Sequence, residues 1–586
     1  MTELMPAAPL LIGALLLPIL PRRLRPVLFV LAPALGFGLL TQLSASAVLT
    51  WPLLNYELMI SRVDRLSLAF GYVFTLAAFL GAIYGFHVRD LGQQVAALLY
   101  AGAGLGVVFA GDWLTLYVFW EIMAMASVWL ILSARTGLST RAALRYLLMH
   151  LCGGAVLLAG ILWHIQDTAS LSFEPLPVSG AGWLILLGFA VNAAIPPLHA
   201  WIADSYPEAT PTGSVFLSAF TTKAAVYVLA RAFPGAELLL IAGTAMALYG
   251  VIFAVIENDI RRILSYHIVS QVGYMIAGIG LGTETALNGA TAHAFAHILY
   301  KGLLFMATGA VIQATGRRRL SELGGLNGPL RWVLVFYMFG ALSISGLPLL
   351  SGFVSKSLVI HAAELEHRGW VVLLLSVASV GTFGSVGLKL PYFTWFRSRR
   401  PIKTDAIPCG MYLAMALASA INLTLGLWPG LLYGVMPFTV TYQPYTAAHL
   451  LESVELLGFT ALAVWFFRAQ MTAKTALTLD VDWFYRHPAP SLRRWFVDAV
   501  NDLFAAAESM VLICVDQVTK LAANPMALRP RLHSYFRPEN AAEKGGSERS
   551  YDPDRYRPAI ALPLLITLAS FVLLLGWYLI SEIRRG

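Results

Sequence analysis

The sequence predicts an all-α, polytopic membrane protein with about sixteen transmembrane helices. Hydrophobic residues make up 58% of the 586 residues and charged residues only 12%, whereas soluble domains carry roughly 25% charged residues. Mean hydropathy is +0.71. Apolar runs of about twenty residues, the length that crosses a bilayer, recur from end to end. These observations exclude a soluble enzyme, a secreted disulfide scaffold and a disordered chain.

The apolar runs follow one another with short polar loops between them. The run at 352–366 is short and follows the GLPLLSG segment at 346–352, so we join it to the preceding run as one interrupted helix. The runs lie at 4–20, 26–49, 66–86, 95–111, 113–133, 143–165, 181–203, 213–233, 236–256, 263–282, 286–314, 330–350, 352–366, 370–397, 408–433, 449–468 and 558–580.

Loop charge predicts the orientation of these helices. Arginines cluster at 22–25, 135–141 and 317–319, each time after an odd-numbered run. Because cytoplasmic loops collect Arg and Lys, we expect the odd loops in the cytoplasm of a bacterial inner membrane and the N-terminus outside. The net charge of +8 then reflects topology and not a nucleic-acid partner. The first run has no cleavage pattern, so we expect it to be retained as a helix.

Prolines and glycines interrupt three of the runs. Ile195-Pro196-Pro197 cuts the seventh run, Pro348 lies in the GLPLLSG break, and Gly387 with Pro391 perturbs the run at 370–397. Backbone groups freed at membrane depth survive only inside protein or beside water. The two breaks at Pro196 and Pro348, one in each half, predict an inverted repeat with an ion path at each break.

The C-terminal part has a different pattern. Residues 493–522 form two clean helical faces, one apolar and one polar, as expected of a helix that lies along an interface. The expected organisation is N-terminal helices (1–92), a first half-repeat (93–233), a second half-repeat (236–400), peripheral helices (401–470), a lateral amphipathic helix (480–525), a polar linker (526–557) and a last transmembrane helix (558–586).

Charged residues inside the apolar runs are the candidate functional groups. A charge at the bilayer centre costs about 2.5–3.5 kcal/mol on insertion scales, so each one is a functional hypothesis. Glu121, Lys223 and Lys301 lie near mid-run, and Lys356 follows a break. For Lys389, near a run end, a snorkelling side chain is an equal alternative, and Glu121 could also be a structural carboxylate. Desolvation brings such acids and lysines toward proton exchange at neutral pH.

His293, His297 and Lys301 are spaced by four and share one helix face. This spacing could bind zinc, but no third ligand is near and the next member is a cation, so a proton relay is the preferred interpretation. Cys152, Cys409 and Cys514 are far apart without a CxxC pair. An iron–sulfur cluster within the chain is therefore excluded, and we expect no cofactor and no bound metal.

Long motifs around these charges resemble a known family. They are FWEIM at Glu121, 196–227, 257–275, 293–306 and GLPLLSGFVSK at 346–356. Over roughly residues 60–400 the chain resembles the antiporter-like subunits shared by respiratory complex I and Mrp-type cation/proton antiporters. LKLPYFTWF (388–396) and DVDWFYR (480–486) look most like the D-type branch of the Mrp subunits, whereas the lateral helix before a final span resembles the longest complex I antiporter-like subunit.

The resemblance implies two inverted five-helix repeats around a hydrophilic axis. It assigns Glu121 as the proton-loading acid, Lys223 as a lysine of the following helix, Lys356 as the residue of the second broken helix, and His293, His297 and Lys301 as the central relay. Arg261 and His267, within the matching 257–275 stretch, are further candidates, as is Lys389.

One position departs from the family pattern. Relatives carry a lysine partner for the glutamate just before the broken-helix proline, where this chain has Asn192, which cannot titrate. Either Lys223 takes that role, or this half binds ions differently, or the subunit is degenerate; we favour Lys223.

The expected function is proton translocation by one subunit of a multisubunit membrane complex, as the D-type member of a Na+/K+–proton antiporter. Two alternatives stay open: a proton-pumping subunit of a complex I-like NADH:quinone oxidoreductase or hydrogenase, and a membrane subunit of an inorganic carbon uptake complex. In each, other hydrophobic subunits and the lipid bilayer are partners, and any redox centre belongs to another subunit.

Overall fold

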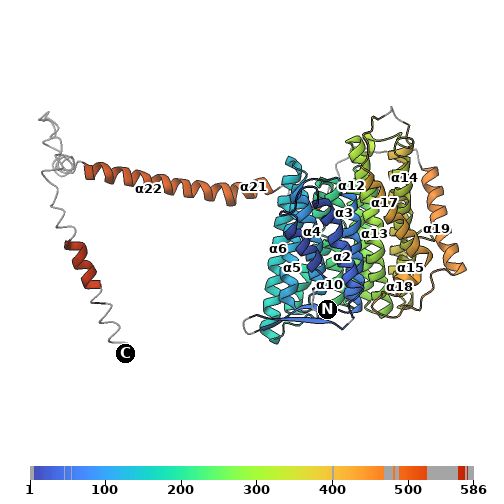
Figure 1. The fold of residues 1–586 in the computed structure, drawn as a ribbon, viewed down its shortest axis with the longest axis horizontal. Coiled ribbons are helices and arrows are strands. Elements are labelled where there is room, and N and C mark those ends of the chain that lie inside the picture. The colour runs from blue at the N-terminus through green and yellow to red at the C-terminus, as the bar shows by residue number, and fades with distance from the viewer. Residues whose placement is uncertain are drawn as a thin grey trace. The chain divides into compact units, whose positions relative to one another are not determined.

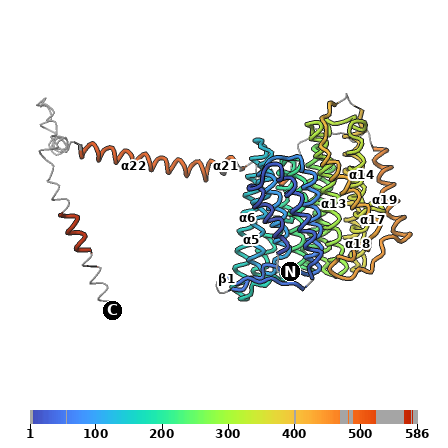
Figure 2. The backbone as a smooth tube through the Cα atoms, viewed as in Figure 1, coloured from blue at the N-terminus to red at the C-terminus, as the bar shows by residue number. Residues whose placement is uncertain are grey.

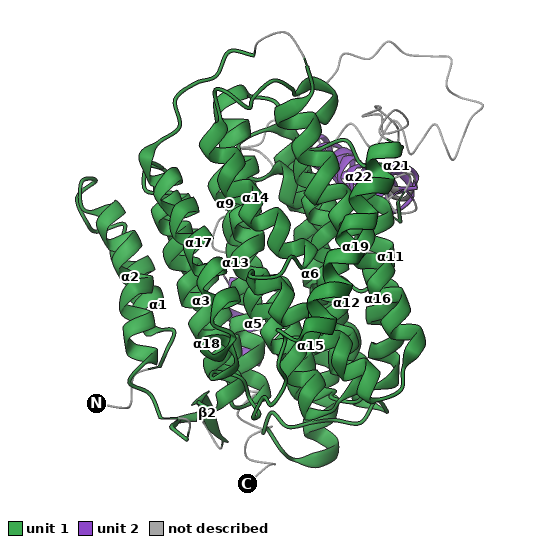
Figure 3. Ribbon diagram, turned by 90° about the vertical axis from the view of Figure 1, so that its right-hand side faces the viewer, with its two compact units in different colours: residues 1–482 green, residues 483–586 purple. Residues whose placement is uncertain are grey.

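A computed structural model describes residues 5–44, 46–53, 56–398, 402–467, 480–481, 483, 488–523, 565–574 and 577. It divides into two units, residues 1–482 and 483–586, which Figure 3 colours separately. The linker expected at 526–557 lies outside the described residues. Of the last apolar run, residues 565–574 and 577 are helical.

Unit 1 is a bundle of helices that stand side by side (Figures 1 and 2). Among the described residues, eleven helices are long and apolar enough to cross a membrane, which confirms a polytopic helical fold but not the count of sixteen. The helices are α1 (Ala8–Leu16), α2 (Arg25–Leu40), α3 (Arg65–Tyr84), α4 (Leu91–Phe109), α5 (Trp113–Leu132), α6 (Gly137–Thr168), α7 (Ala181–Ala193), α8 (Ala200–Ser205), η1 (Tyr206–Glu208), α9 (Pro211–Leu217), α10 (Thr221–Ala232), α11 (Glu237–Ile256), α12 (Ile260–Leu281), α13 (Glu284–Thr315), η2 (Leu320–Glu322), α14 (Arg331–Ser345), α15 (Ser351–Leu365), α16 (Gly369–Thr382), η3 (Phe383–Lys389), η4 (Tyr392–Phe396), α17 (Cys409–Leu427), α18 (Pro429–Tyr433) and α19 (Ala447–Phe466).

A β-hairpin replaces part of the second expected helix. α2 ends at Leu40, and Val48–Leu53 (β1) pairs antiparallel with Tyr56–Arg62 (β2). The run predicted at 26–49 is therefore too long. Its apolar character continues through Val48 and Leu49, but β-branched and aromatic residues at alternating positions favour strands there.

The predicted helix breaks are present. α7 ends at Ala193 and α8 begins at Ala200, and α14 and α15 are separated by a break in which Gly346 and Leu349 have φ angles of +83° and +72°. The helix that starts with α16 continues through the π-helical turns η3 and η4, which contain Gly387 and Pro391. A further break, which the sequence analysis does not anticipate, separates α9 from α10 at residues 218–220.

Two parts of unit 1 repeat the same construction. α5 and α12 each begin after a capping aspartate, Asp112 or Asp259, which accepts backbone N–H groups of its own helix. Each aspartate forms an isolated β-bridge with a residue beyond the next helix, Asp112 with Ser172 and Asp259 with Arg319. The helices in between, α6 and α13, both have 32 residues. The two sets are offset by 147 positions (259 minus 112, and 319 minus 172).

Ion pairs show that the second set is inverted relative to the first. Arg318 pairs with Glu208 (2.7 Å) and Asp259 (2.8 Å), which defines the Glu208 face of the bundle. The apolar segment Pro211–Ala232, which contains α9 and α10, is long enough to cross the bundle from Glu208 to Arg231. Arg231 pairs with Asp64 (2.5 Å) on the opposite, Arg231 face.

The first capping aspartate lies on the Arg231 face. Its bridge partner Ser172 is two residues from Glu174, and Glu174 pairs with Arg62 (2.6 Å), two residues before Asp64. The equivalent aspartates therefore lie at opposite ends of the bundle, which is the arrangement of an inverted repeat.

The same ion pairs show how the interrupted helix crosses the bundle, and a shared hollow shows on which side two of the loops lie. α14 begins after the loop that contains Arg318, so it starts at the Glu208 face. Arg368, which follows α15, pairs with Glu237 (3.0 Å) at the start of α11, on the Arg231 face. The two segments thus make one crossing, as expected. Arg89 and the arginines at 22–25 line one hollow of about 430 Å³ at the Glu208 face, so the first and third loops share a side.

Unit 2 contains one long helical segment. α21 (Ala489–Arg493), the π-helical turn η5 (Arg494–Asp498) and α22 (Ala499–Ala523) follow one another without a gap. This covers the amphipathic helix predicted at 493–522. Asp516 and Lys520 of α22 form an ion pair of 2.6 Å.

Candidate functional site

A buried polar cluster lies where four helices of unit 1 meet. α13 contributes His293, His297 and Lys301, which are all fully buried. α10 contributes Lys223, α12 contributes His267, and α15 contributes Lys356. Lys223, Lys301 and Lys356 lie close enough to His297 to act on it electrostatically. The candidate relay predicted from the sequence is therefore brought together in space.

Two of the three histidines of this cluster, His267 and His293, are held by serine hydroxyls. His267 Nε2 lies 2.6 Å from Ser385 Oγ of η3, and His293 Nδ1 lies 3.1 Å from Ser355 Oγ of α15. The second ring nitrogen of each, and both ring nitrogens of His297, are buried without a hydrogen-bond partner. His267 and His293 can therefore exchange a proton at a free ring nitrogen while the serine contact orients the ring, and His297 has both ring nitrogens free.

Three lysines donate to carbonyl groups that helix ends leave free. Lys223 Nζ donates to Ser218 O (2.7 Å) in the break before α10. Lys356 Nζ donates to Ile344 O (2.8 Å) at the end of α14. Lys389 Nζ donates to Val255 O (2.6 Å) and Glu257 O (2.8 Å) at the end of α11. Cations favour the negative ends of helices, so Lys389 makes a capping contact and does not snorkel.

Lys301 differs from the other lysines. It lies in the middle of α13, which is continuous, so no helix end supplies a free carbonyl. Its ammonium nitrogen is buried and has no hydrogen-bond partner. An unpartnered buried donor costs about 1–3 kcal/mol. Because such a group lowers stability, we infer that Lys301 is retained for function and not for packing.

Glu121 and Asn192 lie apart from Lys223. Glu121 Oε1 packs against Gly154 of α6, where an added Cβ would lie 2.0 Å from it, and it has no hydrogen-bond partner. Both side-chain atoms of Asn192, at the end of α7, are buried and unpartnered. Among the described residues no ion pair joins Glu121 to Lys223, so the pairing favoured from the sequence is not formed in this structure.

Arg261 connects the two halves. Its guanidinium donates to Ala209 O (2.6 Å) and Pro207 O (3.3 Å), beside η1 of the first half. These contacts give it a structural place at the Glu208 face, six residues before His267 along α12 and therefore less than two helical turns from it.

A polar row in the first half was not predicted from the sequence. His150 of α6 is buried with an unpartnered Nε2 and stacks on Tyr146. The Tyr146 hydroxyl accepts from Ser127 (2.9 Å) and approaches Thr221 Oγ1 (3.4 Å), two positions before Lys223. At the 147-residue offset, His150 is the counterpart of His297, so the internal repeat is the signal that could have found it.

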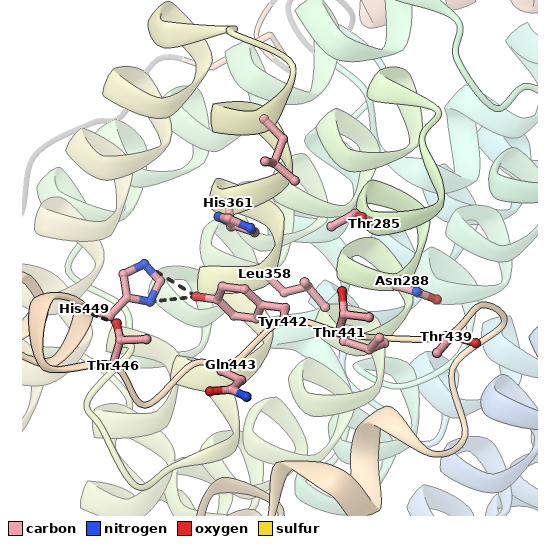
Figure 4. A pocket seen from close by; sticks show the side chains of 12 residues that line it. Thr285, Asn288, Leu358, His361, Thr439, Thr441, Tyr442, Gln443, Thr446 and His449 are labelled. Carbon is pink, nitrogen blue, oxygen red and sulfur yellow. Dashed lines mark hydrogen bonds between the residues drawn. The ribbon is translucent and has the colours of Figure 1, made fainter.

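Lys356 also lines a cavity together with side chains of α19. A cavity of about 70 Å³ is lined by Lys356, Glu364, His449 and Glu452. His449 also lines a neighbouring cavity of about 450 Å³, where it is hydrogen-bonded to Tyr442, which stacks on His361 (Figure 4). Apart from Lys356, these titratable residues, from α15, α19 and the loop before α19, were not singled out from the sequence.

No group of three or more His, Cys, Asp or Glu side chains that could hold a metal ion occurs in the part of the chain that the structure describes. His293 and His297 have ring centroids 6.3 Å apart and three lysines around them. The two histidines and the lysines therefore form a row of titratable side chains.

Sequence comparisons match the chain to a family of membrane proteins and to several relatives. The family described as "NADH:quinone oxidoreductase/Mrp antiporter, TM" matches residues 110–382. The D subunit of a Na(+)/H(+) antiporter of Alkalihalophilus pseudofirmus is 32% identical over 301 residues, 48% of this chain and 60% of that protein. An uncharacterised protein of Mycobacterium tuberculosis is 30% identical over 455 residues, 68% of each chain. The chain thus spans about 60% of the antiporter subunit's length.

Solved structures share the fold. A chain of the Mrp complex from Dietzia sp. matches with a TM-score of 0.66 at 22% identity, over 80% of this chain and 98% of that one. A chain of respiratory complex I from Thermus thermophilus matches with a TM-score of 0.66 at 25% identity, over 78% of this chain and 100% of that one.

The inverted repeat, the two broken helices and the buried cationic axis define a polytopic membrane protein of the antiporter-like class. The chain belongs to the NADH:quinone oxidoreductase/Mrp antiporter transmembrane family.

Proposed function

We propose that the chain translocates protons across a bacterial inner membrane as the antiporter-like subunit of a multisubunit complex, and that it exchanges Na+ or K+ for protons. The half-repeats at 93–233 and 236–400 each contain a helix that is broken at a proline, Pro196 in the first and Pro348 in the second. Glu121 loads the first half, Lys223 passes the proton to His297, His293 and Lys301, and Lys356 releases it.

The observation that carries the proposal is Lys301, a buried ammonium with no hydrogen-bond partner, beside histidines that each have at least one unpartnered ring nitrogen. A membrane protein retains such groups where they take up and release protons. His150 and the hydroxyl row beside Thr221 extend the same chemistry into the first half. The antiport function is supported by the name of the Alkalihalophilus pseudofirmus relative and by the fold shared with the Mrp complex.

The test uses the intact complex, purified from native membranes through a tag on this chain and reconstituted into proteoliposomes. A pH-sensitive dye inside the vesicles reports proton flux after a Na+ or K+ gradient is imposed. We expect flux from the wild type, loss of flux from Lys223→Ala, and normal flux from the exposed control Lys403→Ala. Near-normal flux from Lys223→Ala would contradict the assigned relay.

A redox-driven pump is the second candidate, favoured by the complete coverage of a complex I chain and by the long helix of unit 2. Mass spectrometry of the proteins that co-purify in mild detergent separates the two, with iron and flavin measured alongside. Small hydrophobic subunits without iron or flavin support the antiporter. Iron–sulfur and flavin proteins support the pump, and a single large soluble zinc protein supports inorganic carbon uptake.

A further inference from the structure

A carboxylate from far along the chain lies against the first broken helix. Asp480, which follows α19 in sequence, is 281 positions from His199, yet its Oδ1 lies 3.2 Å from His199 Nε2. The side chains of His199 and Asp480 are 0% and 2% exposed. His199 is the residue that precedes α8, directly after the break that follows α7.

The surroundings of Asp480 keep it ionised. Tyr249 of α11 donates its hydroxyl to Oδ1, and Tyr266 of α12 donates to Oδ2 at 2.7 Å. The Val481 N–H donates to Oδ1 at 2.6 Å. Burial raises the pKa of Asp480, but the hydrogen bonds and the His199 ring outweigh it and hold the pKa well below the usual value of 3.8.

The contact fixes the tautomer of His199. An ionised carboxylate only accepts hydrogen bonds, so Nε2 carries the hydrogen and Nδ1 of the neutral ring carries the lone pair. Nδ1 is buried and has no partner. The ring therefore has one free position for a proton, and a carboxylate in place to stabilise the imidazolium that forms.

We propose that His199 and Asp480 form a proton-binding pair at the Glu208 face of the first broken helix, a site additional to the central relay. The proposal rests on the proposed proton transport. A proton from the Glu208 side binds Nδ1, the ring becomes imidazolium beside the Asp480 carboxylate, and the same proton leaves from Nδ1 toward the break. Asp480 is the positioning residue and His199 the carrier.

The position supports this assignment. Glu208, nine residues after His199, is part of the ion-pair network that defines the Glu208 face, where the arginine-rich loops lie. Trp201 of α8 lies edge-on to the His150 ring with 4.6 Å between the centroids, so α8 is in contact with the polar row of α6.

Other charged groups around His199 are already paired. On its own helix α8, Asp204 accepts from Arg145 of α6 at 2.6 and 2.8 Å. Tyr249 of α11 lies edge-on to the ring at 4.5 Å. On the α12 side, beyond Tyr266, Arg262 pairs with Glu257 at 2.9 Å. Asp480 is therefore the carboxylate that decides how readily the ring holds a proton.

The test compares proton flux against pH for the reconstituted complex carrying Asp480→Asn, Asp480→Glu, His199→Gln or the double variant Asp480→Asn/His199→Gln. Asp516→Asn, in the exposed ion pair of unit 2, is the matched control. We expect Asp480→Asn to lower flux about tenfold and to move the acidic limb of the profile to lower pH. Asp480→Glu should recover most of the flux, and the double variant should be no worse than His199→Gln alone.

Two results would overturn the proposal: flux from Asp480→Asn like that of the control, or a uniform loss at every pH that adds to the loss from His199→Gln. If Asp480→Asn does not fold, Asp480→Glu and His199→Gln still give the pH profile. Nitrogen-15 NMR of histidine-labelled protein tests the His199–Asp480 pair separately from the proposed proton transport. A His199 signal that titrates, and that Asp480→Asn shifts, would support the pair even if the wild type moved no protons, which would refute only the proposed transport. A His199 signal that does not respond to Asp480→Asn would refute the pair.

Discussion

Replacing Lys301 by methionine should abolish transport and at the same time stabilise the protein. The ammonium is fully buried in the middle of α13 and has no hydrogen-bond partner. Methionine has a similar length and volume and no donor to satisfy. The substitution therefore removes a buried unpartnered group and breaks no hydrogen bond.

The magnitude follows from these contacts. Burying an unpartnered polar group costs about 1–3 kcal/mol, and a volume-conserving substitution costs less than about 1.5 kcal/mol. We expect a net gain of about 1–2 kcal/mol in the free energy of unfolding. Because 1 kcal/mol moves Tm by about 2–4 °C in a domain of 150–250 residues and by less in a longer chain, Tm should rise by roughly 1–3 °C.

The assay measures both properties on one preparation. Thermal unfolding of the purified complex is followed by intrinsic tryptophan fluorescence, to which the buried Trp113, Trp120 and Trp395 contribute, and proton flux is measured in proteoliposomes. Lys403→Met, at an exposed position, is the control and should change neither. A Lys301→Met variant that still transports, or that unfolds at a clearly lower temperature, would refute the reasoning that Lys301 is kept for function at a cost in stability.

Three further predictions concern stability. Removing the helix cap in Asp112→Ala should cost about 0.5–2 kcal/mol, and Asp259→Ala should cost more because it also breaks an ion pair; equal losses in thermal unfolding would contradict the difference in contacts. Gly280→Ala would put a Cβ 2.1 Å from a backbone nitrogen of α11 and should destabilise by about 1–3 kcal/mol or more, whereas Gly458→Ala meets open space and should stabilise by about 0.5–1 kcal/mol. Burial and a neighbouring arginine lower the pKa of His87 below its usual 6.5, so the unfolded chain binds more protons there and stability falls as pH drops below about 6.5. His87→Gln should flatten that decline between pH 6.5 and 5 in unfolding experiments, and a variant that follows the wild-type curve would refute the assignment.

Much of the fold follows from local sequence signals. Apolar length locates most of the helices, and Pro196, Pro348 and Gly387 mark three interruptions that the structure confirms. The spacing of four on α13 places His293, His297 and Lys301 together because helical periodicity is local.

The features that the sequence did not reveal depend on tertiary contacts. The break before Lys223 falls at residues 218–220, which contain neither glycine nor proline. The hairpin at 48–62 is hidden because a strand and a helix end share the same apolar composition. The contact between His199 and Asp480 joins segments 281 positions apart, and no local pattern encodes such a distance.

Cation-driven proton flux distinguishes antiport from redox-driven pumping. The complex containing the wild-type chain is reconstituted into sealed proteoliposomes with a pH-sensitive dye inside, and a Na+ or K+ gradient is imposed without any electron donor. We expect a pH change that requires the cation gradient and disappears in Lys301→Met. A complex that is intact and correctly inserted but moves protons only when an electron donor and acceptor are supplied would contradict the antiport function.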